Sequence, residues 1–103
     1  MSGKIIVREV FTAKPGMAGK LAKLFKKGFG HADNIRVMTD LVGNYNTVVM
    51  EMHFNNLAEF EKEMNDYKAG KMPSNLSKEV AEELSKYSEM YVSGKREIFE
   101  ILE

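Results

Sequence analysis

Hydrophobic positions along the chain follow first the period of a strand and then the period of a helix. Residues 4–13 (KIIVREVFTA) are rich in β-branched and aromatic side chains and run into a Lys-Pro-Gly turn signal. Beyond that turn, apolar residues recur at helical spacing opposite a stripe of lysines; they are Met17, Leu21, Leu24, Phe25 and Phe29. The pattern predicts a strand followed by an amphipathic helix that ends near residues 28–30.

Two more extended runs come next, residues 34–42 (NIRVMTDLV) and 45–54 (YNTVVMEMHF). Gly43 and Asn44 separate them, and both residue types tolerate the positive φ of a tight turn. The two runs are therefore predicted to form a β-hairpin.

Two helical patterns and a strand complete the chain. Asn56 with Glu59 three residues later resembles a capping box, and the helix it opens is expected to end at Gly70. A second helical pattern begins near Ser74 and is expected to end at Gly94; its apolar side comprises Leu76, Val80, Leu84, Tyr87 and Tyr91. Residues 95–102 (KREIFEIL) alternate polar and apolar, which is typical of a strand.

This order of elements predicts a fold. It is βαββαβ with an extra helix before the last strand, the split βαβ order of ferredoxin-like folds. Right-handed crossovers place the helices on one face of a four-stranded antiparallel sheet. At 103 residues the chain has room for one core, so we expect a single α+β domain over residues 1–103.

The second face of the sheet also needs cover, because the strands are apolar on both sides. The first strand has Ile5 and Val7 on one face and Ile6 and Val10 on the other. At about 25 cal/mol per Å² of apolar area, leaving one face in water would forgo several kcal/mol. A second copy of the sheet is the economical cover, and we expect a homodimer joined sheet to sheet.

Composition and motifs then narrow the function. The 15 basic and 15 acidic residues cancel, which argues against nucleic acid as a partner, and no long apolar run or signal-peptide pattern points to a membrane. We therefore expect a cytoplasmic protein. The chain has no cysteine, and the Glu51-x-His53 pair is too small a ligand set for a metal. Phosphate-loop, dinucleotide, nucleophile-elbow and calcium-loop motifs are missing, so no cofactor is expected.

Two segments carry a family resemblance: VREVFTAKPGMAGKLAKLFKK, with its strand-KPG-helix start, and RVMTDLVGNYNTVVMEMHFNNLAEFEKEM, a hairpin followed by a Leu-x-x-Phe helix. They resemble the dimeric α+β barrel superfamily, in particular its NIPSNAP and antibiotic-biosynthesis-monooxygenase-like branch. The resemblance implies a cofactor-independent oxygenase of polyphenols or quinols, a haem-degrading enzyme, a small isomerase or a protein without known activity. The pocket tryptophan implied for haem degradation is missing, which weakens that reading.

A charged set is the first candidate site, with His53, Arg8 and Glu51 as the expected catalytic residues and Arg36 and Asp40 as expected substrate-binding residues. Strand alternation directs Glu51 and His53 to the face turned toward the partner, together with Arg8, Arg36 and Asp40. His53 is the best candidate base, because a free imidazole titrates near neutrality, and Arg8 or Arg36 would stabilise a substrate anion. The alternative is a paired polar network that sets the register of the dimer, since buried charges must be paired.

Apolar residues between the sheet and the helices are the second candidate; those selected are Phe11, Met50, Phe60 and Tyr67. They either line a pocket for a substrate or form an ordinary core.

Two functions follow from the sequence. One is a cofactor-independent monooxygenase-like enzyme or isomerase acting on a small aromatic or polyketide-like substrate. The other is a non-catalytic small-ligand-binding or stress-associated dimeric module, and a purely structural dimer with a filled interior also stays open.

Overall fold

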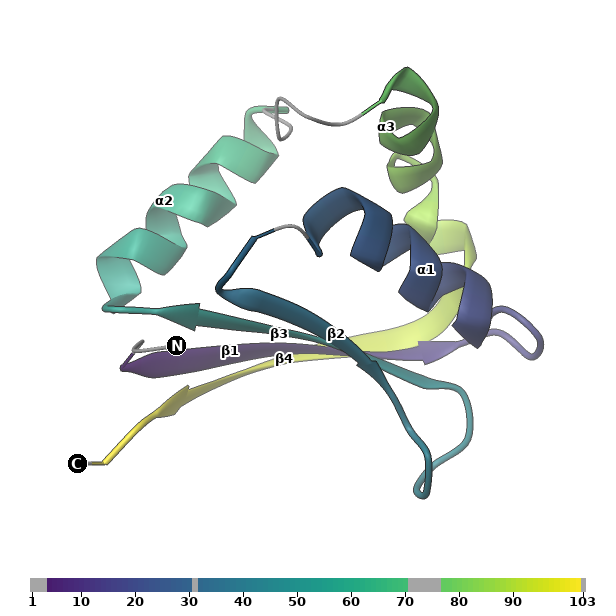
Figure 1. The fold of residues 1–103 in the computed structure, drawn as a ribbon, viewed down its shortest axis with the longest axis horizontal. Coiled ribbons are helices and arrows are strands. Elements are labelled where there is room, and N and C mark those ends of the chain that lie inside the picture. The colour runs from purple at the N-terminus through teal and green to yellow at the C-terminus, as the bar shows by residue number, and fades with distance from the viewer. Residues whose placement is uncertain (1–3, 31, 71–76, 103) are drawn as a thin grey trace.

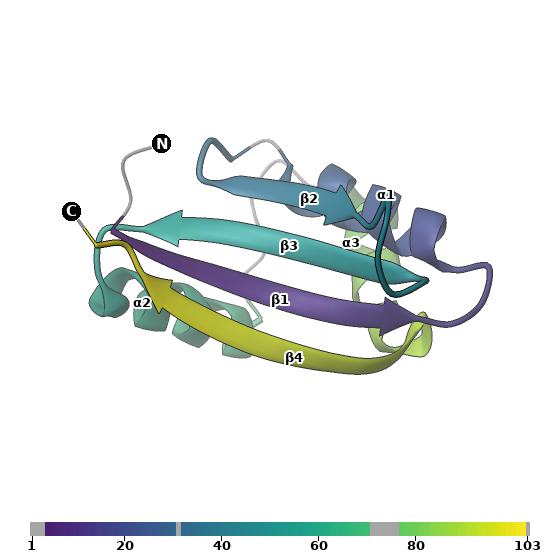
Figure 2. The same ribbon diagram turned by 90° about the horizontal axis from the view of Figure 1, so that it is seen from below.

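The computed structural model describes residues 4–30, 32–70 and 77–102. The elements are, in chain order, β1 (Ile5–Ala13), α1 (Ala18–Phe29), β2 (Ile35–Thr39), β3 (Thr47–Phe54), α2 (Leu57–Lys68), α3 (Lys78–Leu84), the short 3₁₀ helix η1 (Tyr87–Glu89) and β4 (Tyr91–Glu100). Within the described residues the strands form one antiparallel sheet in the order β2-β3-β1-β4, and the helices lie on one of its faces (Figures 1 and 2). The ferredoxin-like α+β fold is thus confirmed.

The two faces of the sheet follow from the alternation of side chains along β1. Ile5, Val7 and Phe11 are buried beneath the helices, whereas Ile6 and Val10 on the opposite face are half-buried. We call this opposite face the open face, because no helix of the described chain covers it (Figure 2).

The core on the helix side gathers around α1. Leu21, Leu24 and Phe25 are buried against Phe11 and Val48 of the sheet. Amphipathic spacing thus aims α1 at the sheet and leaves its lysines exposed. A smaller cluster at the other end of the sheet comprises Ile5, Val7, Met52 and Phe54, with Phe60 of α2 packed on it.

The predicted end of the second strand is wrong. β2 stops at Thr39, and residues 40–46 form the loop to β3. The Oδ1 of Asp40 accepts a hydrogen bond from the backbone N–H of Thr47 at 3.0 Å, and Asn46 adopts a positive φ of 65°. Asp40 therefore closes this loop by a local side-chain to backbone bond, which competes with continued strand pairing.

The predicted helix up to Gly94 is also wrong in its second half. α3 ends at Leu84, and β4 begins at Tyr91 rather than at residue 95. Tyr87 and Tyr91 still face the core, but from a 3₁₀ turn and a strand. Gly94 is a point of close approach inside the strand, since a Cβ built there would lie 3.2 Å from the ring of Phe11. The predicted start at Ser74 lies outside the described residues. Among those described, Ser77 caps the N-terminus of α3.

Among the described residues, no helix is both long enough and apolar enough to span a bilayer.

Candidate functional site

The first candidate site is on the open face, centred on the carboxylate of Glu51. Strand register places Arg8 of β1 and Arg36 of β2 on either side of it. The Nε of Arg8 lies 3.1 Å from Oε2 of Glu51, and the Nε and Nη2 of Arg36 lie 2.9 and 2.6 Å from Oε1. His53, two residues along β3, brings its Nε2 to 3.0 Å from the same Oε1. These four side chains form what we call the Glu51 cluster.

The environment of Glu51 keeps it ionised. It is 1% exposed, and burial alone would raise its pKa. Hydrogen bonds from His53, Arg36 and Arg8 outweigh that effect and lower the pKa from 4.5 to about 2. A carboxylate with so low a pKa is a weak base near neutrality, because it has little tendency to take up a proton. Its geometry suits a pairing role more than proton transfer.

Asp40, predicted to join this cluster, does not reach it. Its carboxylate closes the β2–β3 loop instead. Phe99 of β4 is the additional neighbour, since the guanidinium of Arg8 lies 5.5 Å from the centre of its ring.

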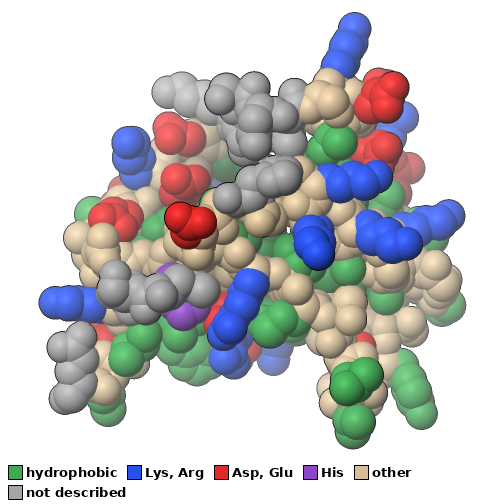
Figure 3. Space-filling model, in the orientation of Figure 1, with side chains coloured by type: hydrophobic (Ala, Val, Ile, Leu, Met, Phe, Trp, Pro, Cys, Tyr) green, Lys and Arg blue, Asp and Glu red, His purple; other side chains and the backbone are tan. Residues whose placement is uncertain are grey.

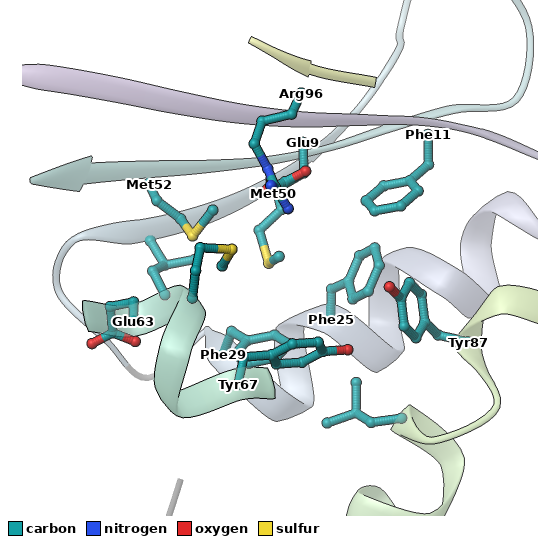
Figure 4. A pocket seen from close by; sticks show the side chains of 13 residues that line it. Glu9, Phe11, Phe25, Phe29, Met50, Met52, Glu63, Tyr67, Tyr87 and Arg96 are labelled. Carbon is teal, nitrogen blue, oxygen red and sulfur yellow. The ribbon is translucent and has the colours of Figure 1, made fainter. Parts of the chain in front are cut away.

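The second candidate site is a cavity of about 130 Å³ on the helix side of the sheet. Residues of all four strands form its floor, and helices α1, α2 and α3 with η1 form its walls (Figure 4). Its lining is mostly aromatic and thioether; it comprises Glu9, Phe11, Phe25, Phe29, Ile35, Met50, Met52, Glu63, Met64, Tyr67, Leu84, Tyr87 and Arg96. We call it the helix-side pocket.

An ion pair lies in the floor of this pocket. Glu9 is 9% exposed, and the Nε of Arg96 lies 2.5 Å from its Oε1. The two residues face each other across β1 and β4. The guanidinium of Arg96 also lies 5.6 Å from the ring centre of Phe60, so α2 helps to hold it.

Two tyrosines add hydroxyl groups. Burial raises the pKa of Tyr87, and a hydrogen bond with Tyr67 and the nearby charge of Glu9 raise it further. Tyr87 therefore keeps its proton at neutral pH, and its hydroxyl can donate to an acceptor. Figure 4 shows Arg96 and Glu9 on the sheet side of the cavity and Tyr67 and Tyr87 on the helix side.

The structure thus divides the predicted site residues between two faces of the sheet. Arg8, Arg36, Glu51 and His53 meet on the open face. Phe11, Met50 and Tyr67 line the helix-side pocket, and Phe60 packs beside it against Phe54 in a tilted arrangement, with 5.8 Å between ring centres. The sheet separates the two groups, so a ligand in the pocket does not contact the Glu51 cluster. The catalytic roles assigned to His53, Arg8 and Glu51 stay predictions.

Sequence reasoning missed Glu9 and Arg96. The signal was present, because Glu9 occupies a core-facing position between Val7 and Phe11, where strand alternation calls for an apolar side chain. A buried carboxylate needs a partner, and the last strand supplies Arg96 at the matching register.

Metal ligands do not converge in either site: no three His, Asp or Glu side chains among the described residues are grouped to hold an ion.

Comparison by sequence gives no relative: no family model matches the chain, and no curated protein matches it. Comparison of structures does find similar folds. A NIPSNAP domain protein from Burkholderia xenovorans superposes with a TM-score of 0.70 at 11% identity, covering 95% of this chain and 94% of that one. A NIPSNAP-like domain protein from the same organism gives 0.68 at 17% identity, covering 98% and 88%.

A NIPSNAP family protein from Agrobacterium tumefaciens is similar as well, with a TM-score of 0.67 at 11% identity over 92% of this chain and 90% of that one. At such identities the likeness extends to the fold alone. The resemblance read from the sequence is confirmed at that level: the chain has the α+β fold of NIPSNAP-like domains.

Proposed function

We propose that the protein is a homodimer that binds a small aromatic ligand in the helix-side pocket of each subunit. The ligand is a single ring bearing a hydroxyl or carbonyl group. One observation carries this proposal: the buried carboxylate of Glu9, paired with the half-exposed guanidinium of Arg96, lies in the floor of a largely apolar cavity. An apolar pocket with a few placed polar groups is typical of a small-molecule site.

The volume of the pocket sets the size of the ligand. An engineered apolar cavity of about 150 Å³ accepts benzene. At about 130 Å³ the helix-side pocket matches the size of one ring better than that of a fused polycyclic skeleton. The proposed ligand is accordingly smaller than many polyketide products.

The polar groups set the orientation of the ligand. A phenolic hydroxyl can donate to the Glu9 carboxylate, while an oxygen acceptor can take a hydrogen bond from Arg96 or Tyr87. The ring then lies among Phe25, Phe29 and the pocket methionines.

Methionine methyl groups provide the test. Met50, Met52 and Met64 line the pocket, so their labelled methyl signals in NMR spectra report on a ligand there. We expect phenol or hydroquinone to shift these signals and 1-anthrol to leave them unchanged. Glu9→Gln should weaken binding, whereas Glu61→Gln on the exposed side of α2 should not. If none of these compounds moves a pocket methyl signal, the proposed binding site is wrong.

The open face is the proposed dimer interface. Ile6, Val10, Met38 and Val49 lie half-buried on this face, where a second sheet would remove them from water. Within such an interface the Glu51 cluster would set the register of the two sheets, because its two half-exposed guanidinium groups share one carboxylate and would need polar groups of the partner opposite them.

Turnover is the second candidate function, and the position of Glu9 beside Arg96 favours it. Glu9 would accept the proton of a bound phenol, and Arg96 would stabilise the phenolate. The electron-rich ring would then react with dioxygen: one oxygen atom enters the ring to give a quinone, and the other leaves as water. Oxygen uptake with hydroquinone or phenol, abolished in Glu9→Gln, is the expected result. Binding without oxygen uptake would contradict turnover and support ligand binding as the function of the pocket.

A further inference from the structure

The loop between β2 and β3 carries an exposed apolar tip. Leu41, Val42 and Tyr45 are 99%, 95% and 88% exposed. In Figure 1 the loop hangs below the sheet, on the side away from the helices, and Figure 3 shows hydrophobic side chains at the end of this projection.

The loop holds a defined shape. The Thr47 N–H donates to Oδ1 of Asp40 at 3.0 Å, and the Asp40 N–H donates to the carbonyl of Thr47 at 3.3 Å. The Thr47 hydroxyl donates to the carbonyl of Asn44 at 2.6 Å. The tip is thus built to present its apolar residues rather than to fold them back onto the sheet.

A folded protein rarely leaves several large apolar residues together in water, and those that do so usually mark an interaction site. The chemistry of the tip identifies its counterpart. Residues 41–45 (LVGNY) carry no charge. The half of the open face nearest the loop carries one charged strand residue, Lys95, and borders on Asp40, whose carboxylate is bonded to the backbone of Thr47; its uncharged residues are Val10, Thr12, Met38, Thr47, Val49 and Ser93. The charged Glu51 cluster occupies the other half.

We propose that residues 41–45 form an arm that clasps a second copy of this chain and covers the largely uncharged half of its open face. The arm projects on the side where that copy sits. A two-fold interface buries both arms equally, because each subunit gives one and receives one. This inference rests on the proposed homodimer and adds a contact that sheet stacking alone does not require.

The lack of cysteine makes a direct test simple, since one introduced thiol is the sole reporter. Tyr45→Cys places it on the arm, and Lys23→Cys places it on the exposed side of α1 as the control. We expect the arm thiol to react with dithiobis(nitrobenzoate) at least tenfold more slowly than the control thiol in the dimer. Sedimentation will show the concentration at which the dimer dissociates. Below that concentration we expect the two thiols to react at the same rate.

The possible outcomes distinguish failure of the proposed arm from failure of the proposed homodimer. A dimer in which both thiols react equally fast would overturn the arm and leave the homodimer intact. A chain that is monomeric at all concentrations would overturn both. As an independent variant, Leu41→Ser with Val42→Ser should raise the dimer dissociation constant at least tenfold while the circular dichroism spectrum stays unchanged; an unaltered constant would contradict the arm.

Discussion

Glu51 is a buried residue through which pH acts on stability. Its pKa is about 2 in the folded chain and 4.5 for an ordinary exposed carboxyl group. A group whose pKa is depressed by folding stabilises the protein above its unfolded pKa. That stabilisation is lost as pH falls through the folded pKa, because the unfolded chain takes up the proton first.

The first prediction is therefore an acid-side loss of stability between about pH 4.5 and pH 2. A depression of this size corresponds to an order of 3 kcal/mol in the free energy of unfolding. Urea unfolding at a series of pH values measures it. Glu51→Gln should flatten the dependence in this window, and Glu61→Gln should retain it. An unchanged pH profile in Glu51→Gln would show that the cluster contributes nothing.

His53 tests the role of the Glu51 cluster. Its Nε2 lies 3.0 Å from Glu51, and it shares no wall with the helix-side pocket. We expect His53→Ala to lower the free energy of unfolding by roughly 1 kcal/mol, the loss of one hydrogen bond, and to leave phenol affinity unchanged. Loss of binding or turnover with unaltered stability would instead support the catalytic role predicted from the sequence.

Among the elements, β1 positions both candidate sites. Its alternation sends Arg8 to the open face and the adjacent Glu9 to the pocket. α2 forms part of the pocket wall although none of its residues is fully buried; its Phe60 packs on Phe54, and its Tyr67 is hydrogen-bonded to Tyr87.

Helix α1 offers a matched pair of glycines for the third prediction. A Cβ at Gly28 would lie 2.7 Å from the Cδ1 of buried Leu84, whereas a Cβ at Gly19 meets nothing within 4 Å. Glycine to alanine in an open helical position stabilises by roughly 0.5 kcal/mol, but overpacking costs about 1 to 3 kcal/mol.

Thermal unfolding should accordingly show Gly19→Ala slightly stabilised and Gly28→Ala destabilised. Leu84→Ala in the Gly28→Ala background separates steric overlap from other causes, because the overlap disappears with the leucine side chain. If Gly28→Ala proves as stable as Gly19→Ala, then α1 and α3 do not pack as closely as the structure shows.

At the scale of the whole molecule, the fourth prediction concerns the open face. Val49→Asp places a carboxylate in the proposed interface, and Lys23→Asp places one on the exposed side of α1. We expect Val49→Asp to convert the dimer to a monomer in sedimentation and to lower the melting temperature more, because a buried unpaired charge is costly. Equal melting shifts, or a wild-type chain that sediments as a monomer at micromolar concentration, would contradict the dimer.

Local pattern was sufficient for most of the fold. The periods of β1, α1 and β3 identified these elements, and the alternation in β1 and β3 assigned each side chain to its face. Both periods are properties of a few consecutive residues, so they can be read without a tertiary structure. The secondary structure of Tyr87 and Tyr91 could not be assigned from local spacing in this way. Their spacing fits a helix, yet the backbone pairing offered by β1 draws Tyr91 into β4.

The site depended on tertiary structure. Glu9 and Arg96 are 87 residues apart and meet because β4 returns beside β1 at one particular register. Register also brought Arg36, Arg8 and Glu51 together on the open face, while the sheet itself separated them from Phe11 and Met50. Period assigns a residue to a face, but it does not say which strand lies next to it, because strand pairing is a contact between segments distant in the chain.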